Sequence, residues 1–137
     1  MSRVFLDTNV LAYQFDSGEP EKQESAHRLL DDSAHVFVVS TQVLLELFVV
    51  ITRKLQPAVP PAEAHQVVTT LARLPVVAAD ARLVLKATST SVLHQLSVWD
   101  AMIVEAAAEA GCAELWTEDL AAGVELRGMT IVNPLTG

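Results

Sequence analysis

Four acidic residues occupy positions from which their carboxylates could act together. Asp7 and Asp119 each follow a short apolar run, and Glu46 is the one charged residue between positions 41 and 52. Asp100 begins a long apolar stretch. Carboxylates that lie close together repel one another, so such a cluster needs a bound cation or raised pKa values. Ligands that are all oxygen favour a hard ion, Mg²⁺ or Mn²⁺, over zinc.

A cation held this way supports one particular reaction. It bridges phosphate oxygens and lowers the pKa of a bound water, which becomes the nucleophile for in-line attack on a phosphodiester. Polar residues beside the acids could orient the ligands, and the candidates are Thr8, Asn9, Ser40 and Thr117. Four carboxylates that converge would therefore form a divalent-metal site suited to chemistry on a phosphodiester.

Each of the two acids at strand ends also has an ordinary explanation. Asp7 is followed by Thr8 and Asn9, and all three residue types are good helix N-caps. Asp119 closes the segment Leu-Trp-Thr-Glu-Asp, where an acid is a common turn residue. Its neighbour Glu118 could be the relevant acid instead.

The two acids within helical stretches have competing explanations as well. Glu46 shares a stripe with Gln42 and Arg53 that could face water. Asp100 could be the third residue of a capping box that begins at Ser97. A carboxylate there is stabilised in its ionised form by the helix N-terminus, so the cap does not exclude a metal site.

The helical face on which Asp100 lies favours an inward direction. At 100° per residue it shares a face with Ile103 and Val104, whereas Glu105 and Glu109 are expected to point toward solvent. Asp100 is thus predicted to begin the buried stripe of its helix.

Short β-type runs alternate with longer helical ones, which predicts an α/β fold with a mainly parallel sheet. The expected strands are residues 3–6, 36–39, 75–77, 114–116 and 130–132. The expected helices are residues 10–15, 20–30, 41–55, 61–74, 80–93 and 98–110. In such a sheet ligands bind beyond the strand C-termini, where Asp7 and Asp119 fall. An all-helical fold is the structural alternative, but residues 3–6 and 36–39 are short and rich in β-branched and aromatic side chains.

Composition limits the possible classes of protein. The 137 residues are 51% hydrophobic and 19% charged, which predicts one globular domain over residues 1–137. No apolar run reaches bilayer length, no signal peptide is recognisable, and the single Cys112 cannot form an internal disulfide, so we expect a cytoplasmic protein. The formal net charge of −8 is unfavourable for nucleic-acid binding, unless cations or a partner supply positive charge.

Four segments together resemble the PIN-domain ribonucleases, and most closely the small toxins of VapBC-type toxin–antitoxin pairs. They are Val-Phe-Leu-Asp-Thr-Asn-Val-Leu at 4–11, the isolated Glu46, Ser-Val-Trp-Asp-Ala-Met-Ile at 97–103 and Leu-Trp-Thr-Glu-Asp-Leu at 115–120. The resemblance covers nearly the whole chain, with the motifs in family order.

The resemblance implies a doubly wound sheet and an acidic Mg²⁺ or Mn²⁺ site that cleaves single-stranded RNA. It also implies a homodimer and a small antitoxin that inserts a segment into the groove. The residues that match the family's acidic positions are Asp7, Glu46, Asp100 and Asp119, of which Asp7 and Asp100 are the expected metal ligands. Asn9 and Thr117 match its supporting polar positions.

The remaining residues suggest substrate contacts and two rival functions. Arg82 and Lys86, one helical turn apart, and the pair Arg53-Lys54 are candidate contacts to the RNA backbone. A phosphatase or phosphotransferase with Asp7 as nucleophile would need a second acid at position 9, which is asparagine. The other rival is a protein-binding scaffold without catalysis.

The two tryptophans flank the acidic segments. Trp99 and Trp116 are interpreted as aromatic residues of the core or of a groove wall, in preference to platforms on which bases stack.

Overall fold

The computed structural model describes residues 1–135 and contains a six-stranded sheet with the order β3-β2-β1-β4-β6-β5. The strands are β1 (Ser2–Leu6), β2 (His35–Ser40), β3 (Val76–Val77), β4 (Glu114–Trp116), β5 (Glu125–Leu126) and β6 (Met129–Val132). Every neighbouring pair is parallel except β5 and β6, which form an antiparallel hairpin. The predicted α/β fold with a mainly parallel sheet is confirmed. The edge strand β5, only two residues long, was not predicted.

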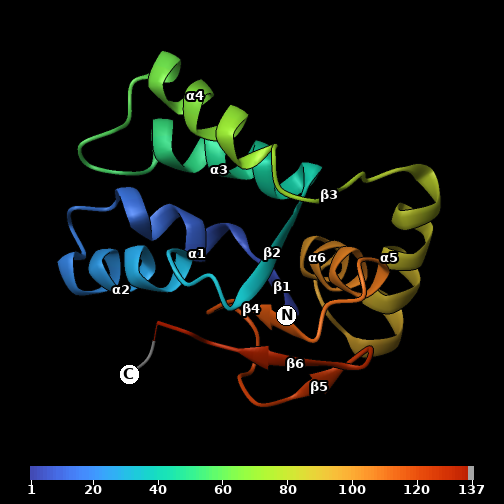
Figure 1. Ribbon diagram of the computed structural model, residues 1–137. Helices are drawn as coiled ribbons and strands as arrows, with labels where there is room; N and C mark the ends of the chain where they lie inside the picture. The colour runs from blue at the N-terminus through green and yellow to red at the C-terminus, as the bar shows by residue number, and fades with distance from the viewer. Residues whose placement is uncertain (136–137) are drawn as a thin grey trace.

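Helices surround the sheet (Figure 1). They are α1 (Thr8–Ala12), the 3₁₀ turn η1 (Tyr13–Phe15), α2 (Pro20–Leu30), α3 (Thr41–Arg53), α4 (Pro61–Leu71), α5 (Ala81–His94) and α6 (Val98–Glu109). In this view α1 and α2 lie on one side of the strands and α5 and α6 on the other, while α3 and α4 stack on each other above. None of the helices within residues 1–135 has the length and apolar character needed to span a bilayer.

Local sequence signals explain where the helices begin and end. Ser40, Asp80 and Ser97 each accept a backbone hydrogen bond from the first turn of α3, α5 and α6, as N-caps do. At the other end of α6, Gly111 has φ +70 and begins a Schellman motif, in which the Cys112 N–H reaches the Ala107 carbonyl. The cap predicted at Ser97 is therefore confirmed, and the other caps mark the ends of their helices in the same way.

The winding of the sheet reverses at β1. The chain passes from β1 to β2 and β3 on one side and returns to β4 on the other, so β1 and β4 flank the switch point. Crevices beyond the strand C-termini at such a point are where open α/β sheets bind ligands. Asp7 follows β1 and Thr117 follows β4, and the Asp7 N–H donates to the Trp116 carbonyl at 3.0 Å. The fold thus brings the two strand ends together at that crevice.

The core lies on both faces of β1 and around α6. Val4, Phe5 and Leu6 are at most 1% exposed, as expected for a central parallel strand covered on both sides. All seven residues from Ala101 to Ala107 are buried in α6. A helix that is buried all round has no solvent face, and this bears directly on one prediction below.

Candidate metal and nuclease site

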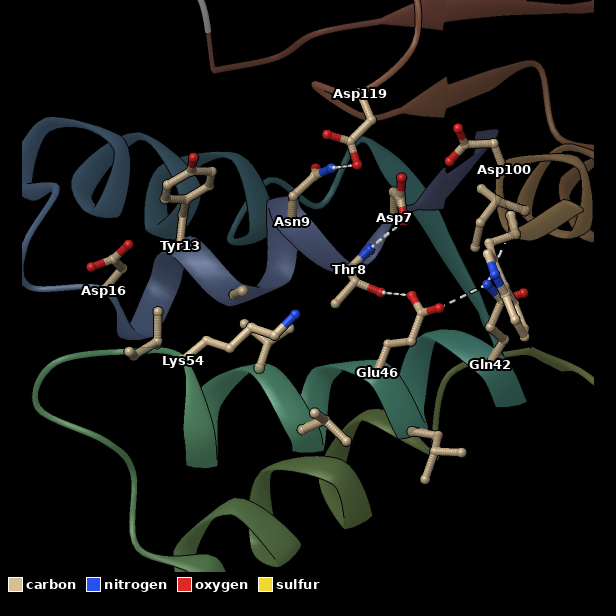
Figure 2. Close-up of a pocket in the computed structure, with 17 residues that line it drawn as sticks. Asp7, Thr8, Asn9, Tyr13, Asp16, Gln42, Glu46, Lys54, Asp100 and Asp119 are labelled. Atoms are coloured by element: carbon tan, nitrogen blue, oxygen red, sulfur yellow. Dashed lines mark hydrogen bonds between the residues drawn. The ribbon is translucent and has the colours of Figure 1, made fainter. Parts of the chain in front are cut away.

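The four predicted acids line one pocket of about 630 Å³ at the switch point. Asp7 follows β1, Glu46 comes from the middle of α3, Asp100 from the first turn of α6, and Asp119 from the loop after β4. Figure 2 shows the four carboxylates around a shared space. Residues as far apart in sequence as 7 and 119 therefore meet at one rim.

Asp7 is the most constrained of the four. Its side chain is only 6% exposed, and it accepts hydrogen bonds from the Thr8 N–H at 2.7 Å and the Thr117 hydroxyl at 2.8 Å. Burial raises the pKa of Asp7 to about 6; the two hydrogen bonds oppose the rise, and the nearby charges of Asp119 and Glu46 add to it. Asp7 caps α1 as well, so the ordinary explanation is confirmed, and the cap leaves its carboxylate at the pocket.

Glu46 and Asp119 are held by neutral polar side chains. Glu46 accepts hydrogen bonds from the Thr8 hydroxyl at 3.1 Å and from the Gln42 amide at 2.9 Å. Asp119 accepts from the Asn9 amide at 3.0 Å. These donors fix the carboxylates without neutralising them, so the negative charge of the site is retained.

Asn9 and Thr117, the predicted supporting residues, lie within this network. The Asn9 amide also reaches the Thr117 hydroxyl at 3.4 Å, and that hydroxyl accepts from the Asp119 N–H at 3.1 Å. A chain of hydrogen bonds therefore links Asp7 to Asp119 through Thr117. It couples the loop after β4 to the first helix.

Asp100 lies half-buried at the pocket wall, and its N–H donates to the Ser97 hydroxyl at 3.1 Å. The predicted inward face of α6 is confirmed for Ile103 and Val104, which are 2% and 0% exposed. The prediction that Glu105 faces solvent is wrong, because Glu105 is only 2% exposed. The helical wheel failed here because α6 is covered on all sides.

Glu105 is paired within the protein. It accepts from the Thr90 hydroxyl at 2.7 Å and from Arg127 at 3.0 Å. Arg127 lies in the β5–β6 turn, 22 residues further along the chain. No local sequence pattern predicts a partner at that distance.

Glu118 lies on the other side of the Asp119 loop and does not line the pocket. It accepts hydrogen bonds from the Tyr13 hydroxyl at 2.6 Å and from Lys22 at 3.3 Å, and Lys22 also lies over the Tyr13 ring. Of the two adjacent acids, Asp119 is thus the one that faces the site. Glu118 anchors the loop that carries it.

This anchor leads to a prediction on stability. Tyr13→Phe removes the phenol that donates to Glu118 and is expected to lower the free energy of unfolding by about 1 kcal/mol. Lys22→Met is expected to have a smaller effect, because the two charged side chains are 38% and 24% exposed and water partly screens the ion pair. Urea unfolding of both variants measures the difference. An equal loss in the two would show that the phenol is not the main anchor.

The candidate RNA contacts fall into two places. Arg82 and Lys86 are exposed on α5, where Arg82 pairs with Glu109, and neither lines the pocket. Lys54, the last residue of the other predicted pair, does line it. Trp99 lines it as well and is 66% exposed, whereas Trp116 is 5% exposed and belongs to the core. Asp16, which the sequence did not single out, lies at the Lys54 end.

The donor set suits a hard divalent cation. In residues 1–135 no three His, Cys, Asp or Glu side chains already converge on one point for an ion. Mg²⁺ does not require that, since it is usually held by one or two carboxylates while waters and substrate phosphates complete its shell. Each carboxylate oxygen has two lone pairs, so the hydrogen bonds to Asp7 leave ligand positions free. Asp7 and Asp100 fit such a cation.

The chain matches a known protein family in sequence and is similar in structure to known proteins. The PIN domain family model matches residues 4–122. A toxin–antitoxin complex from Klebsiella pneumoniae has a similar structure, with 19% identity, a TM-score of 0.70, and coverage of 96% of this chain and 97% of that one. So does Mycobacterium tuberculosis VapC20, a sarcin–ricin loop cleaving toxin, with 20% identity, a TM-score of 0.69, and coverage of 85% and 89%.

A DNA-bound VapBC of Salmonella typhimurium is a third similar structure, with 20% identity, a TM-score of 0.64, and coverage of 96% and 97%. Among curated proteins, none matches the chain in sequence. At these identities the solved structures show the fold, and the family model extends over most of the chain. The chain therefore belongs to the PIN domain family.

Proposed function

We propose that this protein is a divalent-metal-dependent endoribonuclease and the toxin of a type II toxin–antitoxin pair. The observation that carries the proposal is the meeting of Asp7, Glu46, Asp100 and Asp119 in one pocket at the switch point of the sheet. Within residues 1–135 none of the four acids forms an ion pair, so their carboxylates are available to bind a cation that acts on a phosphodiester.

The proposed roles follow from the contacts. Asp7 and Asp100 hold Mg²⁺ or Mn²⁺, which when bound supplies an activated water and neutralises charge on the phosphate. Thr8 and Thr117 orient the Asp7 carboxylate, because each donates a hydrogen bond to one of its oxygens. Glu46, steadied by Gln42, is placed to orient the attacking water and accept its proton.

Asp119 completes the site from the opposite side, where Asn9 holds it. In the reaction a water oxygen forms a bond to phosphorus, the ester oxygen of the RNA leaves, and the leaving oxygen takes up a proton.

The proposed partners are an RNA substrate, a small antitoxin and a second copy of the chain, all in a cytoplasmic setting. Support for the antitoxin comes from the similar structures, two of which are a toxin–antitoxin complex and a DNA-bound VapBC. Support for RNA comes from the VapC20 structure, a toxin that cleaves the sarcin–ricin loop. A predicted single domain over residues 1–137 would carry all of these contacts.

Cleavage of an RNA panel in Mg²⁺, Mn²⁺ or EDTA tests the proposal. We expect cleavage with either metal and none in EDTA, and a loss of about 10³-fold or more in rate for Asp7→Ala and Asp100→Ala, which is about 4 kcal/mol of transition-state stabilisation. Glu63→Gln, which removes an exposed acid on α4, serves as the matched control and should keep full activity. Cleavage that persists in EDTA, or in both alanine variants, would contradict the proposed metal-dependent mechanism.

The two rival functions make different predictions in the same assay. A trapped aspartyl-phosphate on Asp7 would indicate a phosphotransferase. A pure binding scaffold predicts that the Asp7 variant retains every function of the wild type. Asn9 already donates to Asp119 and Thr117, so it is committed to supporting the acids.

A further inference from the structure

Trp99 is a large aromatic side chain exposed at the wall of the acidic pocket. It is 66% exposed and immediately precedes Asp100 in the chain. Its carbonyl accepts from the Gln42 amide at 3.4 Å, so the first turns of α6 and α3 are joined there. The backbone that carries the indole is therefore held in place beside a carboxylate, while the indole itself is open to solvent.

Lys54 marks the opposite end of the pocket. It is the C-cap of α3, is exposed, and is the one cationic side chain among the pocket-lining residues in the described part of the chain. Figure 2 shows Gln42 and Lys54 on opposite sides of Glu46 along α3. The 12 helical steps from Gln42 to Lys54 correspond to about 18 Å of helix. The pocket is thus a groove with Trp99 at one end, the four carboxylates in the middle, and Lys54 together with Asp16 at the other end.

This order of groups suits single-stranded nucleic acid. Proteins that bind single strands stack bases on aromatic side chains and track the backbone with cations. A duplex offers no free base face inside the stack, so it cannot use an indole in this way. At about 3.4 Å per nucleotide in a stacked strand, the groove has room for at most about five nucleotides.

We propose that the groove binds a short single-stranded RNA segment, with one base stacked on Trp99 next to the cleaved phosphate and a backbone phosphate at Lys54. The proposal rests on the proposed ribonuclease function and names the parts of the substrate that this site contacts. Trp99 and Lys54 are on this view binding residues and not catalytic ones.

A protein segment is the competing occupant. Leu45 and Val49 are also exposed at the groove, at 69% and 38%, and could pack against apolar side chains. RNA is favoured because Trp99 and Lys54 bracket the carboxylates from the two ends, which places a base and a phosphate on either side of the cleaved bond. A purely apolar contact would use Leu45 as much as Trp99, and this difference makes the two occupants separable.

Binding of a six-nucleotide single-stranded RNA tests the proposal, with cleavage blocked by the Asp7→Asn background and Mg²⁺ present throughout. In that background we expect Trp99→Leu to weaken binding about 10-fold or more, and Trp99→Phe to keep most of the affinity. Lys54→Met should lower the slope of log affinity against log salt by about one. Leu85→Ala, an equally exposed apolar residue on α5, is the neutral control.

Intrinsic fluorescence reports the stacking directly. The chain has two tryptophans, and Trp116 is buried, so quenching of an exposed tryptophan by RNA reports Trp99. We expect the quenching to survive Trp116→Phe and to vanish in Trp99→Leu. Circular dichroism of each variant shows that it is folded.

Three results would overturn the inference: RNA affinity unchanged in Trp99→Leu, a fully paired RNA duplex bound as tightly as the single strand, or a loss in Leu45→Ala as large as that in Trp99→Leu. The last would show that the apolar wall of the groove as a whole, and not stacking on Trp99, supports binding. Binding that depends on Trp99 without any cleavage by the wild type would refute the proposed ribonuclease, and it would support only the RNA contact at Trp99 and not its place beside a cleaved phosphate. RNA cleavage at the wild-type rate in Trp99→Leu would refute the inference and leave the proposed ribonuclease intact. A complete absence of RNA binding would refute both.

Discussion

Asp7→Asn is expected to stabilise the metal-free protein at neutral pH while it abolishes nuclease activity. Asp7 is almost fully buried beside two other acids, and its pKa is raised to about 6 from 3.8. This difference in pKa corresponds to about 3 kcal/mol, which is an upper bound for the gain in the free energy of unfolding. The asparagine amide must also find an acceptor where the Thr117 hydroxyl now donates, so we expect about 1–2 kcal/mol.

The pH dependence of that gain has a definite sign. Because the folded pKa of Asp7 lies above its unfolded value, the protonated carboxyl favours folding below about pH 4, and this contribution is lost as the pH rises through about 6. The advantage of Asp7→Asn should therefore be largest near pH 7.5 and absent near pH 4. Thermal unfolding in EDTA at the two pH values measures it.

Two controls sharpen this test. Asp119→Asn removes an acid from the same site, but its exposed side chain carries little burial cost, so its gain should be smaller. Addition of Mg²⁺ should raise the melting temperature of the wild type more than that of Asp7→Asn, since an ion that binds only the native state stabilises it. A variant that is less stable than the wild type at pH 7.5, or equally favoured at pH 4, would contradict the prediction.

Arg127→Asn is expected to destabilise the protein by about 2–4 kcal/mol, although asparagine suits the local backbone better. Arg127 and Gly128 form a two-residue turn between β5 and β6, with φ values of 54 and 80, which is the type I′ pattern that favours Asn-Gly. Replacing Arg127, whose backbone lies in the left-handed region, relieves about 1 kcal/mol of backbone strain. It also leaves the Glu105 carboxylate buried without its cation, a loss that is typically about 3–5 kcal/mol.

A double-mutant cycle separates the two effects. Glu105→Gln keeps an acceptor for Thr90 and lets the half-exposed Arg127 return to water, so its cost should be about 1 kcal/mol. The double variant should then be more stable than Arg127→Asn alone, because no buried charge is stranded. Urea unfolding of the wild type, the two single variants and the double variant gives the coupling free energy between Glu105 and Arg127. Arg127→Asn with wild-type stability would mean that the relief of turn strain fully offsets the loss of the ion pair, and this would contradict the prediction.

The placement of the acids was predictable because it depends on local signals. Asp7 and Asp119 follow β-type runs, and the carboxyl ends of parallel strands meet at one edge of a sheet. Ser97 and Asp80 cap their helices in the manner that their short side chains allow. Such features need only the neighbouring few residues, and the structure confirms the corresponding elements to within a few positions.

The predictions that failed or stayed open depended on packing between distant segments. Glu105 was expected to face solvent, and its burial follows from Arg127 and from α5 covering α6. The choice between Glu118 and Asp119 was decided by Tyr13, more than 100 residues earlier in the chain. Likewise Lys54 lines the groove and Arg82 does not, a difference that depends on how α3 and α5 are placed around the sheet.

The sequence by itself determined the alternation of strands and helices, the caps, and the set of four acids at element ends, because propensity, periodicity and capping act over a few residues. The tertiary structure decided which of those side chains face one another, which of two adjacent acids points into the pocket, and which tryptophan stays exposed. These depend on the strand order and on the helices that cover each face, since burial is set by whatever segment packs above a residue and not by its neighbours in the chain.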